Sequence, residues 1–212
     1  MHKDKQFFRL AAGMLGLVVF LTYPFLSAKA DSPSPLQVIQ SGSERGLQII
    51  KSSLFEGGPG LQQRRDEILK IVEEYFDFNE LAKRALGRHW KGLAPDKRER
   101  YVQLFKQLLF NTYVRRIEAS ATPTTTIRYE RQMIEGRYAV VKTRAVGANQ
   151  PDVEIDYKLL LSGGQWKVYD VIIEGISLVD NYRQQFSSIL DSESFESFLK
   201  RLSEKIKEGS GS

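Results

Sequence analysis

The sequence predicts an α+β fold in which a curved four-stranded antiparallel sheet packs against several helices. Apolar residues recur at spacings of three and four before residue 124 and again after residue 177, which is typical of amphipathic helices. Between these regions the period falls to two, with glycines at the turns, which is typical of antiparallel strands. The 212 residues are 42% hydrophobic and 11% aromatic, enough for one packed domain.

The first thirty residues differ from the rest of the chain. A basic start precedes an uncharged run over residues 10–28, which ends in the small-residue triplet Ala28-Lys29-Ala30. This order predicts a secretory signal peptide, residues 1–30, cleaved before Asp31. An uncleaved membrane anchor is the alternative, because the run approaches the roughly 18 to 20 apolar residues that span a bilayer. Pro24 shortens its apolar part, which favours cleavage and leaves residues 31–212 as a single domain.

Charge and cysteine usage exclude several functions. Residues 1–30 hold four basic residues and one acidic residue, so their removal lowers the formal net charge from +5 to +2. A chain this close to neutral, without a basic run interleaved with aromatics, gives no footprint for nucleic acid. The absence of cysteine from the sequence excludes a disulfide, a thiolate zinc site, a cysteine nucleophile and a lipidated cysteine.

Two helices are expected before residue 76. Residues 36–54 show a loose helical pattern interrupted by Gly42 and Gly46, and a glycine-rich turn at 56–60 ends it. A second helix continues through Tyr75.

A short helix and a long helix follow. Asp77 can cap a helix over 79–86 that stops at Gly87. Pro95 suits the first turn of the next helix, which carries a core-facing stripe. The stripe includes Tyr101, Phe105 and Leu108, and a second apolar flank of Val102, Leu109, Phe110 and Val114 indicates that this helix is covered on two sides.

Four strands are expected over residues 125–134, 137–147, 152–162 and 165–174. Glu135-Gly136 and Gly163-Gly164 are expected as two-residue loops, since glycine supplies the positive φ of tight hairpins. Two amphipathic helices close the chain, carrying Leu178 to Ile189 and Phe195 to Ile206, and residues 208–212 are expected to form a flexible tail.

The second hairpin predicts which side chains share the covered face. Pairing Ser162 with Gln165 places Leu161 opposite Trp166, Leu159 opposite Val168, Tyr157 opposite Asp170 and Ile155 opposite Ile172. In the strand before it, the charges of Lys142 and Arg144 indicate that the alternate residues Ala139, Val141, Thr143 and Ala145 point inward. The register across residues 147–151 stays open.

Few residues suggest a catalytic or ligand-binding role. His89 lacks a partnered group, and the sequence contains neither a Gly-x-Ser-x-Gly elbow nor, at 57–60, the Lys and Ser/Thr of a phosphate loop. Asp170 on the covered face beside Tyr157 is expected to be a hydrogen-bonded structural carboxylate, with an acid of raised pKa as the functional alternative. No metal or cofactor is indicated, and the surplus apolar face describes a carrier better than an enzyme.

Several segments resemble the MlaC/toluene-tolerance family, and the match spans most of residues 36–206. They are Phe76-Asp-Phe-Asn-Glu-Leu-Ala82, Leu86-Gly87 with Trp90, Arg100-Tyr-Val-Gln-Leu-Phe-Lys106, and Trp166-Lys-Val-Tyr-Asp-Val-Ile-Ile-Glu-Gly-Ile-Ser-Leu-Val179 followed by Asn181-Tyr-Arg-Gln-Gln-Phe186. The final block is the specific part.

The resemblance implies a soluble periplasmic phospholipid carrier. Its partners would be an inner-membrane ABC transporter complex and an outer-membrane lipoprotein complex, and it would keep the outer membrane asymmetric. It implies no catalytic residue and no cofactor, and it places acyl chains in an apolar cavity between sheet and helices. We expect that cavity to be lined by Tyr101, Phe105, Leu108, Ala139, Val141, Ala145, Ile155, Tyr157, Leu159 and Val168.

Two other functions remain open from the residues alone. One is an enzyme on a cone-shaped α+β fold that uses Asp170 with Tyr157 as an acid–base pair on a small apolar substrate. The other is an interaction module that binds a transporter without carrying lipid.

Overall fold

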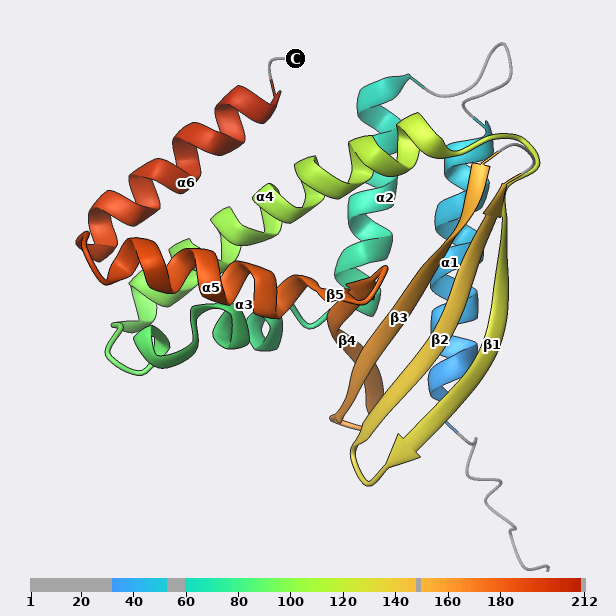
Figure 1. Ribbon diagram of the computed structural model, residues 1–212, viewed down its shortest axis with the longest axis horizontal. Coiled ribbons are helices and arrows are strands. Elements are labelled where there is room, and N and C mark those ends of the chain that lie inside the picture. Colours follow the sequence, from blue (N-terminus) through green and yellow to red (C-terminus); the bar gives the residue numbers. More distant parts are fainter. Residues whose placement is uncertain (1–31, 53–59, 148–149, 211–212) are drawn as a thin grey trace, which may run out of the picture. The chain divides into compact units, whose positions relative to one another are not determined.

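The computed structural model describes residues 32–52, 60–147 and 150–210, and Ser32–Ser212 form one compact unit. The predicted signal peptide, residues 1–30, lies outside the described residues. The α+β class predicted from the sequence is confirmed: a single antiparallel sheet is combined with helices before and after it (Figure 1).

The sheet has five strands in the order β1-β2-β3-β4-β5 rather than the four expected. The extra strand, β5, has two residues that pair with the end of β4, too short a segment to show a period of two in the sequence. The strands are β1 (Thr126–Glu135), β2 (Tyr138–Gly147), β3 (Gln150–Ser162), β4 (Gln165–Ile173) and β5 (Ile176–Ser177).

The hairpin turns follow from glycine. Gly163 and Gly164 have φ values of 57° and 79°, which matches a tight loop with two left-handed positions. In the first hairpin Glu135 pairs with Tyr138, so the loop is Gly136-Arg137, one residue later than expected. Gly136 has a φ of 57° there.

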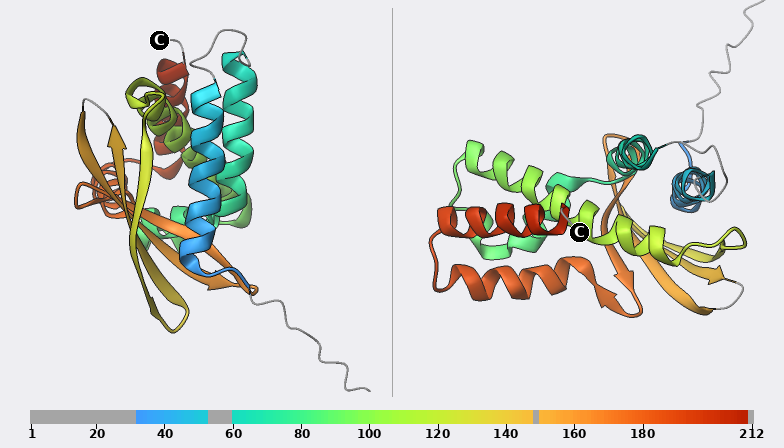
Figure 2. Two further views of the ribbon diagram at one scale, coloured as in Figure 1. Left: turned by 90° about the vertical axis from the view of Figure 1, so that its right-hand side faces the viewer. Right: turned by 90° about the horizontal axis from the view of Figure 1, so that it is seen from above.

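The helices divide into two groups (Figures 1 and 2). Helices α1 (Pro35–Ser52) and α2 (Leu61–Tyr75) lie against one face of the sheet, here called the inner face. The second group gathers near β4 and β5. It contains α3 (Phe78–Leu86), the 3-10 helix η1 (Gly87–Trp90), α4 (Pro95–Ser120), α5 (Leu178–Leu190) and α6 (Phe195–Ser210).

Several helix boundaries confirm the sequence signals. The Asp77 side chain accepts a hydrogen bond from the Glu80 N–H at 2.9 Å, and Gly87 ends α3 with a φ of 56°. Pro95 opens α4, as expected. Helix α6 continues through Ser210, so Glu208 belongs to the helix rather than to a flexible tail.

Three hydrophobic clusters hold the unit together. The first joins α3, α4, α5 and α6. The second joins α1 to the inner face of β2, β3 and β4. The third joins α1, α2 and the second half of α4 through Ile50, Ile68 and Val114. Helix α4 therefore contributes to two clusters, which confirms that it is covered on two sides.

An irregularity in β4 overturns part of the predicted register. Leu159 pairs with Val168 as expected, but a shift follows between Lys158 and Leu159. Because one extra residue in a strand reverses the alternation of its side chains, Tyr157 pairs with Val171 and Asp170 pairs with Lys158. The predicted pairing of Tyr157 with Asp170 is therefore wrong, as is that of Ile155 with Ile172; Ile155 pairs with Ile173.

Candidate functional site

The centre of the inner sheet face is closely packed. Ala139, Val141, Leu159 and Val168 are all at most 3% exposed and belong to one cluster with residues of α1. The register places Ala139 opposite Leu159. Four of the ten residues expected to line a cavity therefore lie together, and their side chains contact protein.

The same face continues toward the turn between β2 and β3 with less cover. Ala145, Ile155 and Tyr157, three further expected residues, are half-buried there. Ile173 and Leu178 are also half-buried and pack against the same cluster. This end of the inner face therefore keeps accessible apolar surface.

The pairing of β2 with β3, which could not be predicted from the sequence, determines which residues share this face. Across β2 and β3, Val141 lies opposite Tyr157, Thr143 opposite Ile155 and Ala145 opposite Val153. A second irregularity, between Ala145 and Gly147, precedes the turn. The inward direction of the small β2 side chains is confirmed by burial, because Val141 is 0% and Thr143 1% exposed.

Two tyrosines bring polar atoms to this apolar face. Burial, and then the neighbouring Tyr129, raise the pKa of Tyr157 to about 12, so its phenol is neutral at ordinary pH. The Tyr129 hydroxyl is 2.7 Å from the Ser43 hydroxyl of α1. Within the described ranges the Tyr157 hydroxyl has no hydrogen-bond partner. It can therefore donate a hydrogen bond to a ligand, while its raised pKa disfavours a role as a base.

The remaining three expected residues lie elsewhere. Tyr101, Phe105 and Leu108 are at most 3% exposed in the cluster of α3, α4, α5 and α6. The Tyr101 and Phe105 rings stack with centroids 5.6 Å apart, and Phe186 of α5 lies 5.2 Å from Phe105. The structure does not bring this stripe onto the sheet face, so these residues form a helical core.

Asp170 is a structural carboxylate, but its partners differ from the one expected. It is 3% exposed and accepts hydrogen bonds from the Ser177 hydroxyl at 2.7 Å and the Val179 N–H at 3.1 Å. Lys158 Nζ lies 3.3 Å from it. Because Asp170 and Tyr157 lie on opposite faces of the sheet, the proposed acid–base pair does not form.

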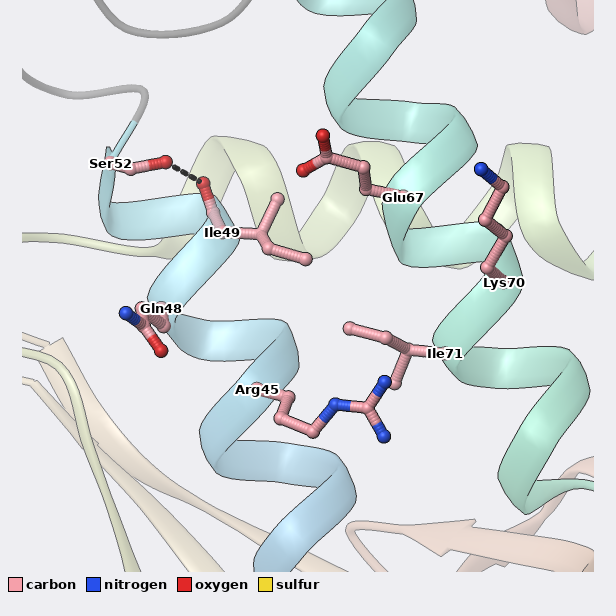
Figure 3. A pocket seen from close by; sticks show the side chains of 7 residues that line it. All are labelled: Arg45, Gln48, Ile49, Ser52, Glu67, Lys70 and Ile71. Carbon is pink, nitrogen blue, oxygen red and sulfur yellow. Dashed lines mark hydrogen bonds between the residues drawn. The ribbon is translucent and has the colours of Figure 1, made fainter.

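Sequence reasoning missed a groove of about 480 Å³ between α1 and α2 (Figure 3). Ile49 and Ile71 point toward one another across it, and Arg45 reaches between the helices. One signal was Gly42 of α1: a Cβ there would lie 3.0 Å from the Tyr75 ring of α2, whereas a Cβ on Gly46 would meet nothing within 4 Å. The groove is lined by Arg45, Gln48, Ile49, Ser52, Glu67, Lys70 and Ile71.

A second hollow, of about 390 Å³, lies where the α2–α3 connection meets α4 and the β3–β4 hairpin. Phe76, Phe78 and Val102 supply its apolar lining, and Glu73 and Lys106 form an ion pair of 2.6 Å beside them. Neither hollow is lined by any of the ten expected residues.

Groups suited to metal binding are not assembled in the part of the chain that the structure describes. Among residues 32–52, 60–147 and 150–210, no group of three His, Asp or Glu side chains could hold a metal ion. His89 lies near Arg88 and Asp191 at 3.3 Å and 3.8 Å, an exposed polar contact on η1.

An open antiparallel sheet with an apolar, partly accessible inner face beneath two helices defines a small α+β domain. Among the described helices, none is long and apolar enough to cross a membrane. The chain belongs to the MlaC protein family, whose model matches residues 40–204.

Similar proteins support this assignment. Toluene tolerance protein ttg2D of Pseudomonas putida is 23% identical over 183 residues, covering 82% of this chain and 80% of the relative. The intermembrane phospholipid transport system binding protein MlaC of Haemophilus influenzae is 18% identical over 191 residues, covering 88% and 89%. The phospholipid-binding protein of Ralstonia solanacearum, solved in complex with a phospholipid, has a TM-score of 0.75 at 23% identity and covers 84% of this chain and 99% of its own.

Proposed function

We propose that the chain is a periplasmic phospholipid carrier. It would shuttle glycerophospholipids between the inner and outer membranes as the soluble substrate-binding component of an ABC transport system, and so maintain outer-membrane asymmetry. The family match over residues 40–204 carries this proposal. The name of the Haemophilus relative and the phospholipid in the Ralstonia structure support it.

The physical need for such a carrier is large. At about 0.8 kcal/mol per buried CH₂, two acyl chains of roughly fifteen carbons are worth on the order of 20 kcal/mol in water-to-apolar transfer. A lipid therefore does not cross an aqueous compartment unaided at a useful rate. A protein that covers the chains with apolar side chains removes this barrier.

We place the acyl chains against the less covered end of the inner sheet face. Ala145, Ile155 and Tyr157 are half-buried there, whereas Val141 and Leu159 are already covered by protein. The helical stripe of Tyr101, Phe105 and Leu108 supports α4 and does not contact the ligand in this proposal.

Export completes the proposal. A signal peptide over residues 1–30 would deliver the chain across the inner membrane and leave a free domain, residues 31–212. Its proposed partners are the inner-membrane ABC transporter complex and the outer-membrane lipoprotein complex.

The direct test is extraction of the purified mature protein with organic solvent. Mass spectrometry of the extract should show phospholipid at a near-equal molar ratio to protein. Protein that is folded and carries no phospholipid, and takes none up from mixed micelles, would contradict the carrier function. The same measurement separates the carrier from an interaction module without lipid.

A further inference from the structure

The end of the β1–β2 hairpin is unusually apolar for an exposed surface. Met133, Ile134 and Tyr138 are 44%, 53% and 43% exposed. Five large apolar side chains in the described part of the chain are this exposed, and three of them lie within six consecutive positions at this turn. Single exposed apolar residues are common, whereas a concentration at one turn marks an interaction surface. Residues 131–138 are called the hairpin tip below.

Apolar side chains occupy both faces of the hairpin tip. Ile134 pairs with the buried Ala139, which places it on the inner face. Met133 pairs with Val140 and so lies on the opposite face, the outer face. Tyr138 is adjacent in sequence to the inward-facing Ala139, so its side chain also lies on the outer face. In Figure 1 and in the left view of Figure 2 the turn of this hairpin extends past the first turn of α1. At its base the Gln132 side chain accepts a hydrogen bond from the Leu36 N–H of α1 at 2.9 Å.

This two-sided arrangement discriminates between kinds of partner. A protein surface that docks on a sheet covers one of its faces, and the other face gains nothing from being apolar. A bilayer interface surrounds whatever projects into it, so apolar side chains on both faces of a tip are buried together. Tyrosine is enriched at the membrane–water interface, because its ring is apolar and its hydroxyl can stay hydrated.

The charges around the tip point to the same partner. The tip carries two exposed arginines, Arg131 and Arg137, and one exposed carboxylate, Glu135, so its formal charge is +2 − 1 = +1. Neither arginine has a carboxylate partner within the described residues; Arg137 donates only to the Leu161 carbonyl, at 3.4 Å. Farther along the same sheet face Lys142 is paired with Asp156 at 3.1 Å. Unpaired arginines beside exposed apolar residues complement anionic lipid head groups.

We propose that the hairpin tip docks on the surface of a phospholipid bilayer that carries anionic head groups. Met133 and Ile134 enter the interface, while Arg131 and Arg137 contact phosphates. The Tyr138 ring, 6.1 Å from the Tyr169 ring and 6.0 Å from Arg84 Cζ, stays at the edge of the contact. Binding through so small a tip is weak and reversible, which suits transient contact with a membrane. The inference goes beyond the proposed function, because it depends on this surface and not on what the inner sheet face carries.

Vesicle co-sedimentation of the mature protein tests the proposal. Vesicles of phosphatidylethanolamine with phosphatidylglycerol should bind the wild type at low salt more strongly than phosphatidylcholine vesicles. Met133→Ser combined with Ile134→Ser should weaken binding to the anionic vesicles at least tenfold, because two inserted side chains are lost. Arg131→Gln and Arg137→Gln should each weaken it about fivefold, and added salt should remove that difference.

Ile176→Ser is the matched control, because Ile176 is a 61% exposed apolar residue on β5. It should bind vesicles as the wild type does. Thermal unfolding of every variant confirms that the fold is intact, and lipid extraction measures carriage separately. Failure of the wild type to bind anionic vesicles, or equal binding by the Met133/Ile134 double variant, would overturn membrane docking, and in neither case is the proposed carrier function affected.

Discussion

The carboxylate of Asp170 on β4 accepts a hydrogen bond from the backbone N–H of Val179 on α5, at 3.1 Å. The Ser177 hydroxyl donates to the same carboxylate at 2.7 Å, while its oxygen accepts from the Asp180 N–H at 3.1 Å and so caps α5. A negative charge and a capping hydroxyl at a helix start both stabilise that start. This junction fixes the direction in which α5 leaves the sheet and therefore links the sheet to the helical cluster.

Replacing Asp170 should destabilise the protein without removing its ligand. Asp170→Ala leaves the Val179 N–H unsatisfied and Lys158 unpaired, so we expect the free energy of unfolding to fall by about 2 to 3 kcal/mol. Urea unfolding measures it. The control is Asp156→Ala on the same sheet face, where a more exposed pair with Lys142 predicts a loss below about 1 kcal/mol.

The near-isosteric Asp170→Asn should keep its phospholipid, since the residue faces away from Tyr157. Mass spectrometry of lipids incubated with wild type and variant checks the enzyme alternative. A product formed by the wild type and absent with the variant would show that Asp170 does chemistry.

Two glycines of α1 should respond oppositely to alanine. A Cβ on Gly42 would lie 3.0 Å from the Tyr75 ring, whereas a Cβ on Gly46 meets nothing within 4 Å. Gly46→Ala should raise the free energy of unfolding by about 0.5 to 1 kcal/mol through helix propensity. Gly42→Ala should lower it by about 1 to 2 kcal/mol, because the Tyr75 ring must shift by a few tenths of an ångström to make room for the added methyl group. If thermal unfolding showed the same change for both variants, the contact between Gly42 and the Tyr75 ring would adapt to the methyl group without a cost in stability.

Stability should fall at alkaline pH through Tyr157. Burial, followed by the neighbouring Tyr129, raises its pKa from 10.0 to about 12 in the folded protein. Folding therefore favours the neutral phenol: its contribution is complete below pH 10 and is lost as the pH rises through about 12. Tyr157→Phe should reduce the loss of stability between pH 10 and 12 by on the order of 1 to 2 kcal/mol. Unfolding experiments across that range test this; a loss of stability in Tyr157→Phe equal to that of the wild type would contradict it.

Filling the accessible end of the inner face should displace lipid. Ala145→Trp adds a ring to the half-buried surface where we place the acyl chains, so bound phospholipid should fall several-fold with a loss of unfolding free energy of no more than about 1 kcal/mol. The matched control is Val146→Trp, the next residue on β2, which faces the opposite side. A full lipid complement in Ala145→Trp, as measured by extraction, would move the acyl chains elsewhere.

The mature protein should begin at Asp31. The basic start, the apolar run and Ala28-Lys29-Ala30 fit a cleavable signal peptide. Intact-mass measurement of protein from the periplasmic fraction should therefore give the chain without residues 1–30. Recovery of the uncut chain from membranes would support the anchor instead.

The predictable parts of the fold were those fixed by local backbone chemistry. Asp77, Gly87 and Pro95 each act within one helical turn, so their meaning can be inferred without knowing what packs nearby. Gly163 and Gly164 similarly set the second hairpin and, with it, the pairs from Ser162 to Leu159. The prediction failed at the irregularity after Val168, because an extra residue leaves the local pattern of apolar and polar residues almost unchanged.

The sequence by itself determined the six main helices, the four longer strands and their order, the inward-facing residues of β2 and the family resemblance, since these depend on periodicity, turn chemistry and short motifs. Only the tertiary structure decided that Tyr101, Phe105 and Leu108 belong to a helical core while Ala145, Ile155 and Tyr157 share an accessible sheet face. Amphipathic patterns show that a side chain is buried, but they do not identify the residues against which it packs. The partner depends on how helices far apart in the chain pack against one another, as α4 does against α3, α5 and α6.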